Sequence, residues 1–548
     1  MYYQSTRGRD KGKQASEAIA VGLAADGGLY VPESIPALQQ GWSTELTAMP
    51  YRERAAYVVG MFLSEFNKTE LQQYTTAAYS SNSNNSSNSS NSSSSNNSSS
   101  SNSGSSGKNN SNRNGNGAVN STVNSAVNSV FDSAFDDPAI APVRKLDNGT
   151  FYLELWHGPT CAFKDMALQL HPHLLTASLK KNGDTRDVCI LVATSGDTGK
   201  AALEGFRDIP GIRIIVFYPR DGVSDVQKLQ MTSQEGSNVN VVAVNGNFDH
   251  AQTGVKEIFA DSALAAELNS QGIMFSSANS INWGRLVPQI AYYVSSYCDL
   301  LSRGEIKPDE KINFCVPTGN FGNIMAAYYA EQIGLPIGKL ICASNRNDVL
   351  TQFINTGVYD RVRPFYATAS PSMDILVSSN LERLLFQLSG RDGAAVEGYM
   401  DALRGEGKYE ISGALRDELG RLFAGGMCSE EDTMQTIASV YNKHGYLIDT
   451  HTAVAAKVLE DYREKTGDNT KTVIVSTASP FKFPESVLKA LGHPSDIDGN
   501  QLTSNLAAAT GLNIPAPLSG LGGKTERFNE CVDPEDMKLS VIKFLKRM

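Results

Sequence analysis

The sequence lacks the features that mark several large classes of protein. Its 548 residues contain no run of eighteen apolar residues, and the first ten residues have no apolar core. Neither a membrane-spanning helix nor a secretory signal is therefore predicted. Acidic residues outnumber basic ones by 58 to 48, so the chain has no basic surplus for binding nucleic acid. We expect a cytoplasmic protein that binds neither nucleic acid nor membranes.

Cysteine and histidine are also sparse, with seven residues of each. The cysteines are odd in number and scattered, without the spacing of a disulfide framework or a metal site. Most of them fall in apolar runs, as core thiols do in a reducing compartment. No pair of histidines has the spacing of a zinc protease. The sequence therefore predicts that no metal is bound.

One segment, residues 80–129, consists almost entirely of Ser and Asn. Such a segment cannot bury enough apolar surface to offset the entropy lost on ordering, so we expect a disordered insertion. A self-associating Asn-rich tract is the alternative, but long surface loops add little closure entropy, which favours a tolerated insertion. The tract separates a mainly helical N-terminal domain, residues 1–79, from a catalytic region, residues 130–548.

Within residues 130–548, short apolar runs alternate with helix-like stretches. The runs typical of buried parallel strands are 188–193, 212–217, 239–244, 311–316 and 339–343. A long helix is predicted over 283–301. This alternation predicts an α/β fold of two parallel-sheet domains with the ligand site between them.

Lys164 is the first candidate catalytic residue. It follows Leu155-Trp-His-Gly-Pro-Thr-Cys-Ala-Phe163 and precedes an apparent helix, so it stands among apolar and small residues. Desolvation penalises an ammonium group, and a neutral lysine can attack a carbonyl to form a Schiff base. A snorkelling surface lysine is the ordinary alternative.

Two glycine-containing loops follow predicted strands and precede predicted helices. The first contains Ser195, Gly196, Asp197 and Thr198, and the second contains Gly319, Asn320, Phe321, Gly322 and Asn323. In such loops backbone N–H groups converge on an anion at a helix N-terminus. An ordinary turn between strand and helix is the alternative. Neither loop has the phosphate-loop or dinucleotide pattern, which disfavours nucleotide binding.

Ten motifs occur in an order that resembles the threonine synthase family, pyridoxal-phosphate enzymes of the tryptophan-synthase-β fold group. They lie at residues 5–8, 22–32, 157–160, 162–165, 195–199, 279–285, 319–323, 370–375, 447–454 and 476–483. The resemblance implies that Lys164 attaches pyridoxal 5'-phosphate covalently and exchanges protons with the substrate. It also implies that residues 319–323 hold the cofactor phosphate and that Thr477 faces the pyridine nitrogen.

The resemblance further implies a substrate with its own phosphate. The loop of residues 195–198 would hold the substrate carboxylate, while Asn279, Ser280 and Arg285 would clamp the phosphate. The planar guanidinium of Arg gives charge-assisted, often bidentate contacts to phosphate oxygens, although a lone Arg is more often a surface cation. The implied reaction converts O-phospho-L-homoserine and water to L-threonine and phosphate, by γ-elimination and β-addition, in a monomer or homodimer.

Two alternatives stay open at this point. A pyridoxal-phosphate lyase that releases phosphate, ammonia and a 2-oxo acid would use the same phosphate clamp. A catalytically silent homologue acting as an interaction protein is disfavoured by the intact Lys164. The chain departs from the family at Ser479 and Phe481, where His and Ala are expected, and we expect Phe481 to narrow the site.

Overall fold

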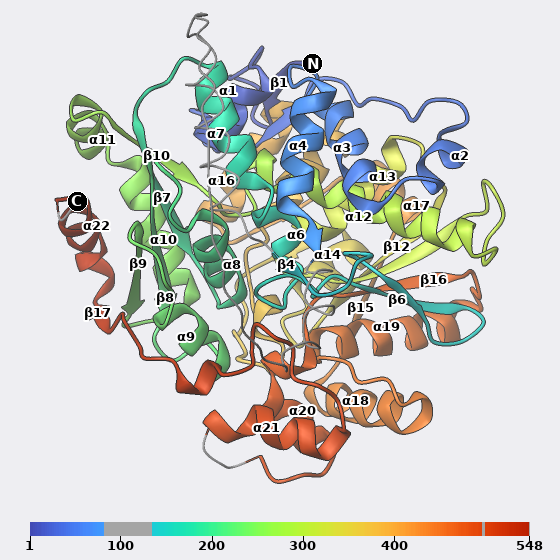
Figure 1. Cartoon of the computed structure of the whole chain (residues 1–548). Coiled ribbons are helices and arrows are strands. Elements are labelled where there is room, and N and C mark those ends of the chain that lie inside the picture. Colours follow the sequence, from blue (N-terminus) through green and yellow to red (C-terminus); the bar gives the residue numbers. More distant parts are fainter. Residues whose placement is uncertain (82–133, 496–498, 547–548) are drawn as a thin grey trace, which may run out of the picture.

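The structure, a computed structural model, describes residues 1–81, 134–495 and 499–546 (Figure 1). The N-terminal part pairs strands β1 (Tyr3–Ser5) and β2 (Tyr30–Pro32) in antiparallel fashion and is otherwise mainly helical, as predicted. Its helices are α1 (Ala15–Val21), α2 (Trp42–Thr47), α3 (Tyr51–Phe62) and α4 (Lys68–Ala78). Asn67 caps the N-terminus of α4 and forms a capping box with Glu70, which satisfies free N–H groups of the first turn.

A five-stranded parallel sheet has the order β10-β7-β8-β9-β17. Its strands are β7 (Asp187–Ala193), β8 (Ile212–Pro219), β9 (Val239–Val244), β10 (Ile273–Ser277) and β17 (Glu530–Val532). One face packs with residues of α10 (Phe248–Ala260), α11 (Ser262–Ser270) and α22 (Met537–Lys546). Residues of α8 (Asp197–Phe206) and α9 (Asp225–Thr232) belong to the core on the other face. Burial on both faces explains the continuous apolar runs of these strands.

A six-stranded sheet has the order β15-β12-β11-β16-β6-β5, and β5 is antiparallel to β6. Its strands are β5 (Val143–Lys145), β6 (Thr150–Glu154), β11 (Ile312–Pro317), β12 (Ile337–Ser344), β15 (Phe423–Met427) and β16 (Thr472–Ser476). Alternate residues enter two apolar cores, because successive side chains point to opposite faces. The helices packed against this sheet include α13 (Gly322–Gln332), α14 (Val349–Thr356) and α19 (Thr450–Thr466).

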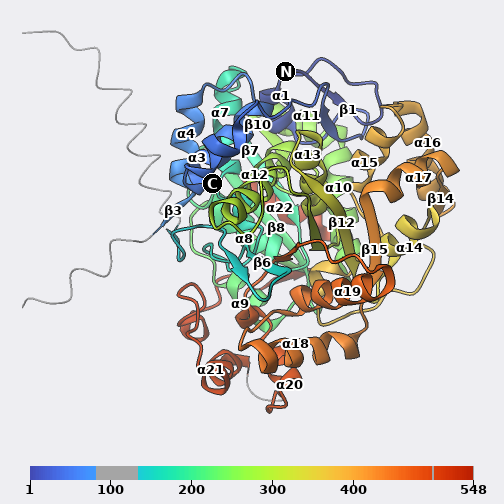
Figure 2. The ribbon, with the colours of Figure 1, turned by 90° about the vertical axis from the view of Figure 1, so that its right-hand side faces the viewer.

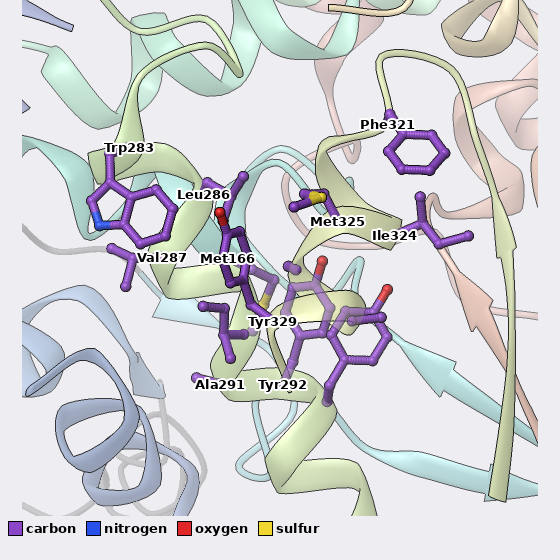
Figure 3. Close-up of a cluster of buried hydrophobic side chains, with 14 of the residues drawn as sticks. Met166, Trp283, Leu286, Val287, Ala291, Tyr292, Phe321, Ile324, Met325 and Tyr329 are labelled. Carbon is purple, nitrogen blue, oxygen red and sulfur yellow. The ribbon is translucent and has the colours of Figure 1, made fainter. Parts of the chain in front are cut away.

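Helix α12 (Trp283–Ser302) connects these parts and is buried along almost its whole length. It packs against α3 of the N-terminal part and against α13. Figure 3 shows the cluster between α12 and α13, where Trp283, Leu286 and Tyr292 meet Met325 and Tyr329. This core supports the two loops of the candidate site, because α12 begins just after residues 279–281 and α13 begins within residues 319–323.

The chain alternates between the two sheets. Figure 2 shows the molecule turned by 90° from the view of Figure 1, with β6, β12 and β15 of one sheet and β7, β8 and β10 of the other labelled. The chain passes from β6 to β7, returns from β10 to β11, and leaves again from β16 to β17. The prediction of two parallel-sheet α/β domains is confirmed, together with all five predicted strands and the long helix. Among the described residues, no helix is both long and apolar enough to span a membrane.

The described residues on the two sides of the gap at residues 82–133 lie next to each other. Strand β3 (Ser80–Ser81) pairs in parallel with β4 (Ala134–Phe135). The prediction of disorder from residue 80 onward was therefore wrong for Ser80 and Ser81, because they pair with β4, and residues 82–129 lie outside the described part of the chain. The remaining helices are α6 (Asp165–Leu168), α7 (His171–Lys181), α15 (Leu381–Leu388), α16 (Gly393–Gly405), α17 (Gly413–Leu422), α18 (Glu430–His444), α20 (Pro484–Ala490) and α21 (Gly499–Thr510), and β13 (Val358–Asp360) pairs with β14 (Lys408–Glu410).

Candidate active site

One cavity of about 80 Å³ collects the site residues expected from the sequence. All of them except Gly196 line it. Three of its lining segments directly follow the carboxyl ends of β7, β11 and β16. Ligands of open α/β sheets bind outside the carboxyl ends of the strands. The cavity therefore lies where this kind of fold binds its ligands.

Lys164 immediately precedes α6 and is 7% exposed. Its Nζ donates to Ser372 Oγ at 3.2 Å and to Asp197 Oδ2 at 3.3 Å. Burial lowers the pKa of Lys164, and the nearby Arg285 adds to that effect, while Asp197 opposes it. The structure thus gives this lysine the lowered pKa that a nucleophilic amine or a general base requires.

The loop of residues 195–199 opens α8 with an unusual backbone. Gly196 has φ of 125°, and a Cβ there would lie 2.5 Å from Gln227 Cδ. Thr194 Oγ1 accepts hydrogen bonds from the N–H groups of Gly196 and Gly199 at 2.9 and 2.8 Å. This geometry directs the buried carboxylate of Asp197 toward Lys164. The first residue of α8, Asp197, therefore gives this loop a negative charge.

The loop of residues 319–323 opens α13 and carries no charged side chain. A Cβ on Gly319 would lie 2.6 Å from the carbonyl oxygen of Ser372, so the backbone approaches closely there. Asn323 Oδ1 accepts from the hydroxyl groups of Tyr292 and Tyr293, each at 2.5 Å. Its Nδ2 is buried and has no partner among the residues that the structure describes. An unpaired buried donor costs free energy unless a ligand satisfies it.

Arg285 lies in the first turn of α12 and is 5% exposed. Its guanidinium donates to Ala278 O at 2.7 Å and to Thr198 Oγ1 at 3.1 Å. Burial lowers the pKa of Arg285 to about 10, so it remains a cation at neutral pH. Asn279 Nδ2 donates to Ala193 O at 3.0 Å, which fixes this segment beside the end of β7.

Ser280 and Thr477 complete the predicted set. Ser280 Oγ accepts from Asn380 Nδ2 at 3.0 Å, and Thr477 O accepts from the N–H of Phe163 beside Lys164. The expectation for Phe481 was wrong. This side chain is 3% exposed and does not line the cavity, because its large apolar ring is buried in an apolar core instead.

Ser372 and His451 are among the lining residues that had no predicted role. His451 Nδ1 lies 2.7 Å from Asp449 Oδ2, and its Nε2 accepts from the backbone N–H of Ser372 at 3.2 Å. This pattern assigns the ring proton to Nδ1. His451 therefore positions the loop that places Ser372 Oγ beside Lys164. Both residues occur in the motifs shared with the family, and that was the only signal for them in the sequence.

Three family models match the chain in succession. They describe the threonine synthase N terminus over residues 2–79, the pyridoxal-phosphate-dependent enzymes over residues 139–478, and the threonine synthase C-terminal region over residues 452–541. The chain belongs to the threonine synthase family. The fold group and cofactor expected from the sequence motifs are thereby confirmed.

Individual members of the threonine synthase family agree over most of the chain. Threonine synthase of Pseudomonas aeruginosa is 37% identical, covering 89% of this chain and 90% of that protein. Threonine synthase-like 1 of Homo sapiens is 39% identical and covers 87% of this chain, but the match spans only 58% of that relative. The structure of yeast threonine synthase has a TM-score of 0.79 at 29% identity, covering 100% of this chain and 99% of that one.

The pyridoxal-phosphate-bound threonine synthase from Brucella melitensis has a TM-score of 0.78 at 34% identity, with 99% of each chain covered. The cofactor of this family is pyridoxal phosphate, and the chemistry of the side chains that line the cavity suits it. The buried amine of Lys164 lines the cavity and can react with an aldehyde. The unpaired Asn323 Nδ2 lies at the N-terminus of α13, in the loop that carries no charged side chain. A phosphate group binds favourably at such a terminus.

Proposed function

We propose that this protein converts O-phospho-L-homoserine and water to L-threonine and phosphate. The observation that carries this proposal is the buried guanidinium of Arg285, which lines the same cavity as Lys164 yet belongs to a different segment from the loop of residues 319–323. A cofactor with one phosphate group needs one phosphate-binding loop. A second anchor, which unlike the loop of residues 319–323 is cationic, supports a substrate that carries its own phosphate.

The cofactor-binding role falls to Lys164, Thr477 and the loop of residues 319–323. Bound pyridoxal phosphate supplies an electron sink for the substrate carbon next to the amino group. The backbone N–H groups at the start of α13 and Asn323 Nδ2 would hold its phosphate. The neutral hydroxyl of Thr477 would face the pyridine nitrogen without protonating it, which suits elimination and replacement chemistry.

The substrate-binding role falls to residues on the other side of the cavity. Arg285, Asn279 and Ser280 would hold the substrate phosphate, and the N–H groups of residues 195–198 would hold its carboxylate. Lys164 would remove a proton from Cα and then one from Cβ. Phosphate would leave from Cγ, which would then take up a proton to become the methyl group, the hydroxyl of a water molecule would add at Cβ, and Lys164 would return a proton to Cα.

The test is to incubate the protein with pyridoxal phosphate and O-phospho-L-homoserine and to measure threonine, 2-oxobutyrate and phosphate together. Equal amounts of threonine and phosphate are expected. Lys164→Ala should lower turnover by about 10²- to 10⁴-fold or more, because it removes the proton-transfer group. Phosphate with 2-oxobutyrate would instead identify a lyase, and absence of phosphate release would identify a silent homologue.

Arg285→Gln separates substrate binding from cofactor binding. Loss of a charge-assisted contact costs about 1.5–3 kcal/mol, so the apparent KM should rise by about 10- to 150-fold. Cofactor affinity should change little in this variant, because the cofactor phosphate is assigned to residues 319–323. An equal loss of cofactor affinity would contradict the assignment of Arg285 to the substrate.

A further inference from the structure

A second lysine lies beside the site and was assigned no role above. Lys482 ends a short 3-10 helix, η2 (Pro480–Lys482), that follows β16, and it is completely buried. Its Nζ lies 2.8 Å from Asp197 Oδ1 and donates to the carbonyl oxygen of Thr160 at 2.9 Å. A buried ammonium group is costly unless it is paired and hydrogen-bonded, so this arrangement calls for an explanation.

The carboxylate of Asp197 is divided between two sets of partners. Its Oδ1 receives Lys482 and the side-chain amide of Gln227, which donates at 2.7 Å. Its Oδ2 lies 3.3 Å from Lys164 Nζ and 3.4 Å from Ser372 Oγ. Lys482 and Gln227 thus hold the oxygen directed away from Lys164, and the other oxygen faces the reactive amine.

We propose that Lys482 is a positioning residue that neutralises Asp197 and fixes its carboxylate, so that Lys164 stands beside an oriented ion pair rather than beside a bare negative charge. This role rests on the proposed attachment of the cofactor at Lys164. The ion pair also prevents electrostatic repulsion between Asp197 and the substrate. A lone buried carboxylate in the loop of residues 195–198 would repel an anionic substrate, whereas the neutral pair of Asp197 and Lys482 does not.

The charges around Lys164 give the direction of the effect. Burial has the largest effect on the pKa of Lys164 and lowers it. Asp197 on α8 raises this pKa, whereas Arg285 on α12 and Lys482 on η2 lower it. His451 on α19 contacts the backbone of Ser372 instead. Removing Lys482 deletes one repulsive cation and leaves Asp197 with less compensation. Both changes favour the charged ammonium form of Lys164.

The experiment follows capture of pyridoxal phosphate by the cofactor-free protein as a function of pH. Capture joins the neutral amine of Lys164 to the aldehyde carbon as a C=N bond, and the aldehyde oxygen leaves as water with both amine protons. The change in cofactor absorbance gives the rate, and reduction with borohydride followed by peptide mapping verifies Lys164 as the site. The pH midpoint of the rate reports the pKa of Lys164 in the folded protein.

Lys482→Met should move this midpoint to higher pH by about one unit, the size of effect that a charge within a few ångströms produces. Lys200→Met is the matched control. Lys200 lies on the same helix as Asp197 and pairs with Glu204 at 2.9 Å, but it does not contact the site. The Lys200→Met variant should leave the pH midpoint of the capture rate unchanged. An unchanged midpoint in a folded Lys482→Met protein would overturn the proposal.

The double variant Asp197→Asn with Lys482→Met guards against a failure of the single variant to fold. Removing both members of a buried ion pair is far less destabilising than removing one. Compared with Asp197→Asn alone, the double variant should again have a higher midpoint, because residue 482 no longer repels Lys164. Identical midpoints would contradict the proposal. A failure of capture at Lys164 in the unchanged protein would instead refute the proposed function.

Discussion

Two loops of this protein have the same local design and different chemistry. Each follows a buried parallel strand, turns at glycine and opens a helix: residues 195–199 open α8 and residues 319–323 open α13. The first places the carboxylate of Asp197 between two lysines. The second places the amide of Asn323 against two tyrosine hydroxyl groups and carries no charge.

This difference shows that the strand–glycine–helix motif alone does not determine the ligand. A helix N-terminus attracts an anion in both loops, but the first turn of α8 already holds the carboxylate of Asp197 with its lysine partners, whereas the start of α13 holds no charged side chain. The neutral loop is therefore the one that we propose for the cofactor phosphate. The charged loop suits a role next to the reacting amine, where its charge is balanced by Lys164 and Lys482.

Asp197→Ala should break the charged loop with the largest effect on stability. It leaves Lys482 buried without its partner, and breaking a buried ion pair in this way costs about 3–5 kcal/mol. Urea unfolding of the cofactor-free protein at neutral pH measures the loss. Glu460→Ala is the control, because its ion pair with Lys457 is exposed and is worth about 1 kcal/mol or less. Equal losses in the two variants would show that Asp197 and Lys482 are not coupled.

Asn323→Ala should break the neutral loop with a smaller effect. It removes the acceptor that the hydroxyl groups of Tyr292 and Tyr293 share, at a cost of about 1–3 kcal/mol for the two hydrogen bonds together. Tyr292 keeps Gln289 Oε1 at 3.1 Å, and Tyr293 keeps the backbone oxygen of residue 323 at 3.2 Å. The same unfolding measurement applies, and the dissociation constant of pyridoxal phosphate should rise as well. A variant that binds the cofactor as tightly as the unchanged protein would remove Asn323 from the phosphate site.

Gly319→Ala and Gly322→Ala test how closely the backbone of the neutral loop is packed. A Cβ at Gly319 would lie 2.6 Å from a carbonyl oxygen, whereas one at Gly322 would meet its nearest atoms at 3.5 Å. Overpacking costs about 1–3 kcal/mol, so Gly319→Ala should destabilise the cofactor-free protein and Gly322→Ala should not. Equal unfolding midpoints would mean that the loop adjusts without cost.

The sequence was sufficient for the local part of this comparison. The apolar runs ending at residues 193 and 316, the glycines after them and the amphipathic stretches beyond predicted both loops and their helices. Lys164 was predictable because a single lysine stands in an apolar and small-residue context. Each of these signals lies within about fifteen residues of chain.

The interactions that make the two loops different could not be read in the same way. Lys482 contacts Thr160 across a sequence separation of 322 residues, and it meets Asp197 only because the chain returns to the larger sheet after β10. Ser372 and His451 reach the site for the same reason. No local pattern of charge or periodicity encodes a pairing created by the alternation of the chain between two sheets.

The smallest expected difference between the two loops is in how the free energy of unfolding depends on pH in acid. Burial alone would raise the pKa of Asp197, but Lys482 and Lys164 hold it well below its usual value. In the unfolded chain its pKa is about 3.9. Below that pH the unfolded state binds a proton that the folded state does not, so stability falls as pH falls, by up to about 1.4 kcal/mol per pH unit. Asp197→Asn should remove this contribution, and unfolding free energies measured between pH 5 and about 3 would reveal the shallower slope.

The amide of Asn323 does not titrate, so the loss of stability caused by Asn323→Ala should be the same across that range. A pH-dependent loss in Asn323→Ala, or an unchanged slope in Asp197→Asn, would mean that the contrast in charge does not govern these loops.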